Sequence, residues 1–329
     1  MKKGLTIITI IGLLLAGMLI ASQGAGEVLK AVTKIGWGIL PVLLIHLLQI
    51  GFSGLGWFAF FSHSSYTGSM SGIVLLRWIR EAINSMLPMT QIGGEIISNR
   101  LLILRGMQGG AAGATIVLDL TMEIVSQFLF TLLGLILVIH TGYQGPVLDW
   151  LIIGLVISVP VIISFFLAQN RGLFKLFEKL MEKLAHSTAL FSKNPIDGLH
   201  DDIQLLYRRH LTLINSCSLH LLSWLAGTFE VWLIMYFIGW PVTLTEALVL
   251  ESLGQAVRSA AFFIPGGLGA QEAGYLLFGL IYGLPPEQGL ALSLIKRLRE
   301  VMLGIPGIFA WQMMEGKQAW SRKKLPDPD

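Results

Sequence analysis

Charged side chains are scarce in this chain of 329 residues. Asp, Glu, Lys and Arg make up 13% of it, whereas a soluble domain carries about 25%. Hydrophobic residues make up 54%, and the mean hydropathy is +0.71. So little charge cannot cover a water-facing globule of this size. The composition therefore argues against a soluble enzyme and predicts an all-α integral membrane protein.

Cysteine is almost absent as well, since Cys217 is the single one and lies in an apolar segment. A disulfide framework and a cysteine-based metal site are therefore excluded. The sequence also lacks the motifs of zinc peptidases, P-loop proteins and serine hydrolases. We expect no catalytic residue, no metal, no cofactor and no binding of nucleic acid.

Long apolar stretches dominate the chain. A helix needs about 20 mostly apolar residues to cross a bilayer. Six stretches are candidates: residues 5–21, 35–61, 111–140, 148–168, 211–238 and 288–313. The first is interpreted as an uncleaved helix and not as a signal peptide, because it is long for one and further spans follow.

Two further apolar regions, residues 73–105 and 244–283, are interrupted near the middle by a proline followed by glycines. Such an interruption ends a helix, and the freed backbone groups must be buried in protein or face a wet cavity. We therefore predict two broken, re-entrant helix pairs. The breaks are assigned to Pro88, Gly93, Gly94, Pro265, Gly266, Gly267 and Gly269.

The order of these segments divides a single transmembrane domain, residues 1–329, into halves at 1–145 and 146–315. Each half has the order span, span, broken region, span, and the second starts on the opposite side of the membrane. This is the pattern of an inverted-topology repeat. Sequence support is thin: with Pro88 aligned on Pro265, the pairs Glu95–Glu272 and Glu123–Glu300 match.

Basic residues in the loops predict the orientation. They gather at the N-terminus, in residues 169–210 and in the tail, all on one side of this topology. By the positive-inside rule that side is the cytoplasm, so both termini are expected there. Within the linker of residues 169–210, apolar positions recur at helical spacing with Lys on the other face. An amphipathic helix on anionic lipid and a solvated linker both fit this pattern.

Charged residues also lie in the broken regions and in the spans after them, where each costs at least about 2.5–3.5 kcal/mol at membrane depth. They are interpreted either as structural ion pairs, with Arg105, Lys296 and Arg299 reaching the interface, or as the lining of a polar midplane cavity. The candidate binding residues are Arg77, Arg80, Glu81, Asn84, Glu95, Arg100, Arg258, Glu272 and Arg297. The candidates for a proton or charge relay are Asp119, Glu123 and Glu300.

A guest in such a cavity is expected to be anionic. A half-helix starts within the membrane after each break, and its N-terminus offers unpaired N–H groups and a partial positive charge. Arginines at the same depth can hold a phosphate through two hydrogen bonds. His46, His140 and His220 stand singly in or beside spans and are interpreted as packing or interfacial residues.

The stretch from Arg77 to Pro88, followed by Gly93-Gly94-Glu95 and the acidic span at Asp119, resembles the flippase-like transmembrane domain of lysylphosphatidylglycerol synthases. The run from residue 264 to Glu272, with Arg297 further on, is similar to that family's second signature. The likeness covers essentially the whole chain and is greatest to the hopanoid-biosynthesis-associated, HpnL-like branch. It implies a lipid-translocating protein of the bacterial inner membrane. Synthase activity is not expected, because only residues 315–329 follow the last span.

The sequence thus predicts flipping or binding of a membrane lipid: a phospholipid, a hopanoid-related lipid or a polyprenyl-phosphate. One alternative is an intramembrane lipid-modifying enzyme with Glu95 or Asp119 as its base. The other is a scaffold that recruits lipid-synthesis enzymes through the basic central loop. Because no ATP-binding motif is present, a proton, ion or lipid gradient would drive transport.

Overall fold

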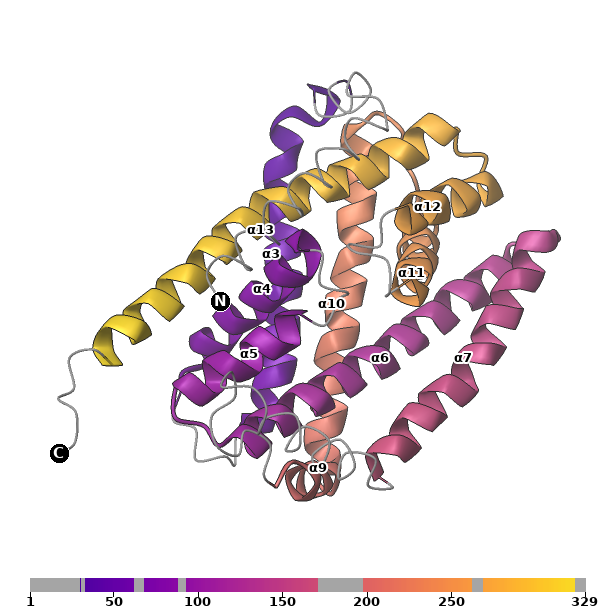
Figure 1. The fold of residues 1–329 in the computed structure, drawn as a ribbon. Coiled ribbons are helices and arrows are strands. Elements are labelled where there is room, and N and C mark those ends of the chain that lie inside the picture. The colour runs from indigo at the N-terminus through magenta and orange to yellow at the C-terminus, as the bar shows by residue number, and fades with distance from the viewer. Residues whose placement is uncertain are drawn as a thin grey trace, which may run out of the picture.

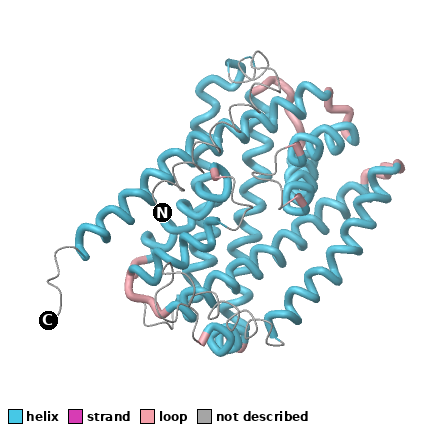
Figure 2. The backbone as a smooth tube through the Cα atoms, in the orientation of Figure 1, coloured by secondary structure: helices cyan, strands magenta, loops and turns pink. Residues whose placement is uncertain are grey.

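The computed structural model describes residues 30, 33–61, 68–87, 93–170, 198–261 and 269–322. In that part of the chain all regular structure is helical, with ten α-helices and two short 3₁₀-helices, η1 (Gly36–Gly38) and η2 (Ala59–Phe61). Figure 2 shows the helices and the loops that join them. The predicted first span and most of the linker lie outside the described residues. So do four of the assigned break residues: Pro88, Pro265, Gly266 and Gly267.

Four of the described helical segments are long and apolar enough to cross a membrane: Thr33–Phe61, Gly109–His140, Leu148–Leu167 and His210–Phe237. They overlap four of the six predicted spans. The segments belong to α3 (Ile39–Phe58), α6 (Gly109–His140), α7 (Pro146–Asn170) and α10 (His210–Phe237). The sixth predicted span lies in α13 (Pro286–Arg322), which does not qualify by composition because several charged residues follow one another near its start.

Each region with a central proline contains two separate helices. The first holds α4 (Met70–Met86) and α5 (Gly93–Leu104), and the second holds α11 (Leu244–Ala260) and α12 (Ala270–Ile281). The Ser69 hydroxyl accepts from the Gly72 N–H and starts α4, while a reciprocal Thr243–Glu246 capping box starts α11. With 12 residues each, α5 and α12 are too short to cross a bilayer. That the pairs are re-entrant stays a prediction.

The helix bounds repeat between the two halves. The helices α5 and α12 start at Gly93 and Ala270, and the helices α6 and α13 start at Gly109 and Pro286. The sequence separation is the same for both pairs of starts. The same separation relates Gly106 and Gly283, two glycines with a positive φ that follow α5 and α12. A left-handed glycine is the usual end of a helix, because it lacks the Cβ that would clash. The helix bounds thus recur in the two halves, while the inverted topology of the repeat stays a prediction.

The helices pack around α10, which runs through the middle of the molecule (Figure 1). Its most extensive partner is α3, and α6 and α11 also pack on it. One apolar core, including Trp57, Ile79 and Leu101, joins α3, α4, α5 and α6. A second, including Val231 and Tyr275, joins α10 with α11, α12 and α13. Each core therefore encloses one of the broken helix pairs.

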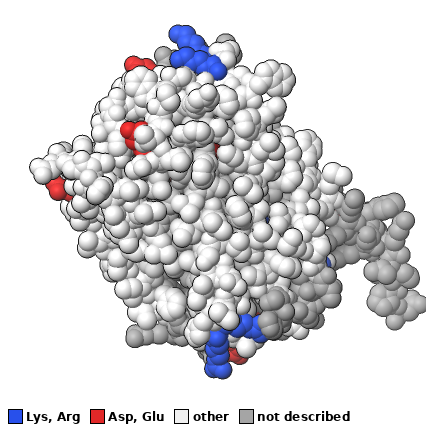
Figure 3. All heavy atoms as spheres, turned by 180° about the vertical axis from the view of Figure 1, so that it is seen from behind, with Lys and Arg blue, Asp and Glu red and all other residues white. Residues whose placement is uncertain are grey.

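The outer surface is largely uncharged. On the face shown in Figure 3, most of the visible Lys and Arg gather at two opposite ends, and a broad band that shows very little of them lies between. The apolar segment of α7 has a mean hydropathy of 2.6, and none of it is buried inside the protein. In Figure 1, α7 lies at the edge of the molecule beside α6. Such an exposed apolar surface fits contact with lipid.

Candidate functional site

A cluster of buried charges joins α4, α5 and α6. The Arg80 guanidinium lies 2.7 Å from Asp119 Oδ2, 3.1 Å from Glu123 Oε2 and 3.3 Å from Glu95 Oε1. Arg77, one turn earlier on α4, donates two hydrogen bonds to the Glu123 carboxylate, at 2.6 and 2.9 Å. The structure thus brings together Arg77, Arg80, Glu95, Asp119 and Glu123, as the sequence predicts for the first half. We call these five residues the first cluster.

Asn84 fixes the start of α5 against α4. Its Oδ1 accepts from the Gly94 N–H at 2.7 Å, and its Nδ2 donates to the Glu95 carboxylate at 3.2 and 3.3 Å. One N–H of this helix start is therefore bound by Asn84, and the helix terminus is less open than the sequence suggests. Gly94 is required at this contact, because a Cβ there would lie 2.3 Å from the Arg80 carbonyl oxygen.

Two side chains outside the predicted set complete the first cluster. His220 Nε2 on α10 lies 2.8 Å from Asp119 Oδ1, and both residues are buried. Trp57 on α3 places its ring 5.4 Å from the Arg80 guanidinium and donates to Thr115 at 3.3 Å. Such a ring face attracts a cation. His220 therefore engages a carboxylate, which goes beyond the packing role expected for it.

A second cluster joins α11, α12 and α13. Arg258 on α11 donates to Glu300 at 2.5 Å and to Gln271 at 3.0 Å. Arg297 donates to the other Glu300 oxygen at 3.1 Å and to Glu272 at 3.2 Å. Glu272 also accepts from the Gly269 N–H at 2.8 Å and so caps its own helix. Arg258, Glu272, Arg297 and Glu300, all predicted, therefore meet, and we call them the second cluster.

Lys296 and Arg299 do not reach the membrane interface, so that expectation is wrong. Their side chains are 0% and 3% exposed. Lys296 pairs with Glu251, which also accepts from the Tyr275 hydroxyl at 3.1 Å. Both basic residues lie on the inward face of α13, where carboxylates on neighbouring helices neutralise them. Pairing therefore takes the place of snorkelling.

A third group of polar side chains lies between the two clusters. His46 on α3 has Nε2 2.5 Å from Glu81 of α4 and Nδ1 3.2 Å from Glu230 of α10. The Arg299 guanidinium contacts His46 Nδ1 and lies 3.0 Å from Glu230. Gln49 donates to the same Glu230 oxygen at 2.6 Å. We call His46, Glu81, Glu230 and Arg299 the central group.

Sequence reasoning missed Glu230 and assigned His46 to packing. Glu230 is the single charged residue in the predicted span 211–238. An ionisable residue within a membrane span is a candidate functional residue by default, so this signal was present. Glu81 was predicted to bind the guest together with Arg77 and Arg80, but it turns to His46. It therefore belongs to the central group.

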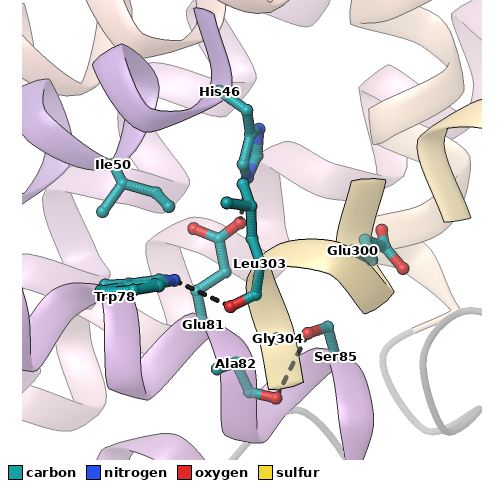
Figure 4. Close-up of a pocket in the computed structure, with 9 residues that line it drawn as sticks. All are labelled: His46, Ile50, Trp78, Glu81, Ala82, Ser85, Glu300, Leu303 and Gly304. Atoms are coloured by element: carbon teal, nitrogen blue, oxygen red, sulfur yellow. Dashed lines mark hydrogen bonds and ion pairs between the residues drawn. The ribbon is translucent and has the colours of Figure 1, made fainter. Parts of the chain in front are cut away.

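A small pocket opens beside the central group. Figure 4 shows that His46 and Glu81 meet on one side of it and that Glu300 of the second cluster lies on the other. The remaining lining residues are Ile50, Trp78, Ala82, Ser85, Leu303 and Gly304. The space in it that a water-sized molecule can occupy is about 10 Å³, roughly enough for one water, so the pocket is far too small for a lipid headgroup.

Arg100 is apart from these groups. Its Nε lies 2.7 Å from Glu315 near the C-terminal end of α13, and its side chain is 44% exposed. The structure therefore separates Arg100 from the other predicted binding residues. Among the residues that the structure describes, no group of three or more His, Cys, Asp or Glu could hold a metal ion.

A family model described as "lysylphosphatidylglycerol synthase TM region" matches residues 8–307, which include both clusters and the central group. The chain belongs to this family. A UPF0104 membrane protein of Methanothermobacter thermautotrophicus is 21% identical over 323 residues, which is 91% of each chain. No solved structure matches. The lysylphosphatidylglycerol synthase TM region family is flippase-like, and the chain is a multi-pass membrane protein.

Proposed function

We propose that this protein binds a membrane lipid and moves it between leaflets by holding its anionic headgroup on buried arginines. One observation carries the proposal. Each half places two arginines, Arg77 and Arg80 or Arg258 and Arg297, beside a broken helix pair and holds them on carboxylates. We propose no catalytic role for these residues.

Stability alone is a weak reason for this arrangement. Buried ion pairs lose much of their attraction to desolvation, and apolar residues of similar volume often stabilise as well or better. In lipid, a charge costs still more and usually marks a binding or transport pathway. A guanidinium that donates two parallel hydrogen bonds to a carboxylate, as Arg77 does to Glu123, can donate the same pair to a phosphate.

The headgroup would take the place of carboxylates that pair with the arginines in the described conformation. In the described conformation each of the four arginines is paired with carboxylates, and the pocket beside the central group is small. We therefore interpret it as a closed state. The short helices α5 and α12 are the elements whose movement would open the clusters. Each carries one cluster carboxylate in its first turn, Glu95 or Glu272, so moving the helix withdraws that carboxylate from its arginine.

The proposed lipid carries a phosphate, as phospholipids and polyprenyl-phosphates do. Membership of the hopanoid-associated branch, and with it a hopanoid-related lipid, stays a prediction. The proposed site of action is the bacterial cytoplasmic membrane with both termini in the cytoplasm, which the distribution of Lys and Arg favours. Lipid-synthesis enzymes are proposed as partners that supply the lipid.

The test is transport in reconstituted vesicles. The full chain would be reconstituted with phosphatidylglycerol that carries a fluorescent group on one acyl chain, and dithionite would report the fraction in the outer leaflet. Arg80→Gln and Arg258→Gln each remove charge-assisted hydrogen bonds worth about 1.5–3 kcal/mol, so transport should fall at least about tenfold. Arg208→Gln, at an exposed arginine after α9 (Leu199–Tyr207), is the matched control and should keep the wild-type rate.

Normal transport by both cluster variants would overturn the proposal. Mass spectrometry of co-purifying lipid would name the lipid class. A changed headgroup with an unchanged leaflet distribution would point instead to a lipid-modifying enzyme that uses Glu95 or Asp119. A requirement for the lysines of residues 175–183, with both clusters dispensable, would point to a scaffold.

A further inference from the structure

We propose that His46, Glu81 and Glu230 form a proton-binding site that couples lipid movement to a proton gradient. This inference rests on the proposed function, because it assigns the driving force for transport through the two clusters. It is carried by the geometry of the central group and by the pocket beside it.

The three side chains form a path from the pocket into the protein. Glu81 lines the pocket, and its side chain is 35% exposed. His46 follows, with its two ring nitrogens facing different carboxylates on two helices. Glu230, at the far end, is 0% exposed. A histidine between an accessible and a buried carboxylate can pass a proton by taking it on one ring nitrogen and releasing it from the other.

Glu230 has an oxygen suited to accept that proton. Its Oε2 receives donors from Gln49, Arg299 and His46. Its Oε1 is buried and has no hydrogen-bond partner among the described residues. An unpaired oxygen on a buried carboxylate is unfavourable. A proton that His46 Nδ1 releases to Oε2 would neutralise the carboxylate and so remove part of that penalty.

The proton also decides where Arg299 binds. A guanidinium only donates and a carboxylate only accepts, so His46 Nδ1 can accept from Arg299 only in a neutral ring whose Nε2–H donates to Glu81, and it can donate to Glu230 only when it carries a proton. A second proton on Nδ1 would make that nitrogen a donor to Glu230 and would repel Arg299. The next carboxylate within reach of Arg299 is Glu300, 3.5 Å from Nη2.

Glu300 belongs to the second cluster, where it holds Arg258 and Arg297. A closer Arg299 would compete with these two arginines for the Glu300 oxygens. Protonation of His46 would thereby loosen an arginine that is proposed to receive the headgroup. Proton binding at the central group and lipid binding at the second cluster are thus linked through one side chain.

The charged groups that face His46 come from the helices packed on α3: Glu81 on α4, Glu230 on α10, and Arg299 and Glu300 on α13. Arg77 on α4 also acts electrostatically on Glu81, and Lys296 on α13 acts on Glu230. Asp119 on α6, which also packs on α3, is engaged by Arg80 and His220.

The experiment uses the same vesicles, with and without an imposed pH gradient and with a pH-sensitive dye inside. In the wild type, the gradient should accelerate lipid movement at least about threefold, and proton flux should accompany it. In His46→Gln and Glu230→Gln, the ratio of the rate of lipid movement with the gradient to the rate without it should fall to one. His140→Gln, at an exposed histidine that ends α6, is the matched control and should keep the wild-type ratio.

The outcomes separate the two proposals. Lipid movement without a gradient reports on the proposed function, and the ratio with and without the gradient reports on the proton site. Wild-type transport that ignores the gradient, or variants that keep the wild-type ratio, would overturn the proton site alone.

A second readout does not require transport. Nitrogen NMR of labelled histidine in the full chain, assigned with His46→Gln, should show the His46 ring changing its protonation state over the range in which histidines titrate. Glu230→Gln should shift that change. A His46 ring that keeps one state throughout would also overturn the inference.

Discussion

Replacing Gly94 with alanine should force the start of α5 away from α4. The new Cβ would lie 2.3 Å from the Arg80 carbonyl oxygen and 2.8 Å from Asn84 Oδ1, whereas ordinary contact begins at 3.4 Å. The Arg80 carbonyl is part of a helix backbone and cannot turn aside, so α5 must shift by about 1 Å. This shift would break the hydrogen bond from the Gly94 N–H and carry Glu95 away from Arg80.

The size of the effect follows from this contact. Overpacking of this kind costs about 1–3 kcal/mol, and the lost hydrogen bond adds about 1 kcal/mol. Thermal unfolding of the purified protein in detergent should report that loss, and vesicle transport should fall at least about tenfold, because a misplacement of 1 Å at a functional site is costly. A loss of transport without a change in thermal unfolding would show that the displacement of α5 is not its cause.

Gly51 supplies the control, because a Cβ there meets nothing within 4 Å. It lies within α3, where alanine is favoured over glycine by up to about 1 kcal/mol. Gly51→Ala should therefore be neutral or slightly stabilising, with normal transport. Equal stability and equal transport in Gly94→Ala and Gly51→Ala would refute the close packing of α5 on α4 as the reason for the glycine.

Two further changes test other parts of the structure. Arg100→Gln should alter transport less than about twofold, because the exposed pair of Arg100 with Glu315 is worth about 0–1 kcal/mol; a large loss in the vesicle assay would instead return Arg100 to the binding site. Thr243→Ala should lower the stability measured by thermal unfolding by about 0.5–2 kcal/mol, because it removes the capping box with Glu246, while transport below the unfolding temperature should not change.

The positions of most helices were predictable from local sequence. Runs of about 20 apolar residues mark the membrane-spanning helices, because lipid requires every backbone group to be paired within the helix. The interruptions were predictable from a proline followed by glycines, because proline removes a donor and glycine weakens a helix; a proline alone does not end a helix here, since Pro160 and Pro306 lie inside α7 and α13. The long helix α13 is the instructive exception. Its charged residues would disqualify a lipid-facing span, and they are tolerated because neighbouring helices provide carboxylates.

The identity of the pairing partners was not predictable. Spacing places Arg77, Arg80 and Glu81 on one side of α4, and the structure agrees that all three face inward. The spacing alone does not reveal which helices surround α4. Arg77 and Arg80 pair with carboxylates on α6, whereas Glu81 contacts His46 on α3. Such contacts depend on how helices distant in sequence pack, and a single sequence carries little information on that.

The charge balance of the clusters links the two proposals. The first cluster holds two guanidinium groups and three carboxylates, with His220 beside them. In the second, Arg258 and Arg297 face two carboxylates, and the nearby Arg299 is shared with Glu230. Neither cluster has positive charge to spare for a phosphate, so an anionic headgroup can bind favourably only if a carboxylate withdraws or takes up a proton. A carboxylate that α5 or α12 withdraws from its arginine would be left unpaired within lipid, so a proton on it would lower the cost of that movement. Lipid entry and proton uptake are therefore expected to occur together.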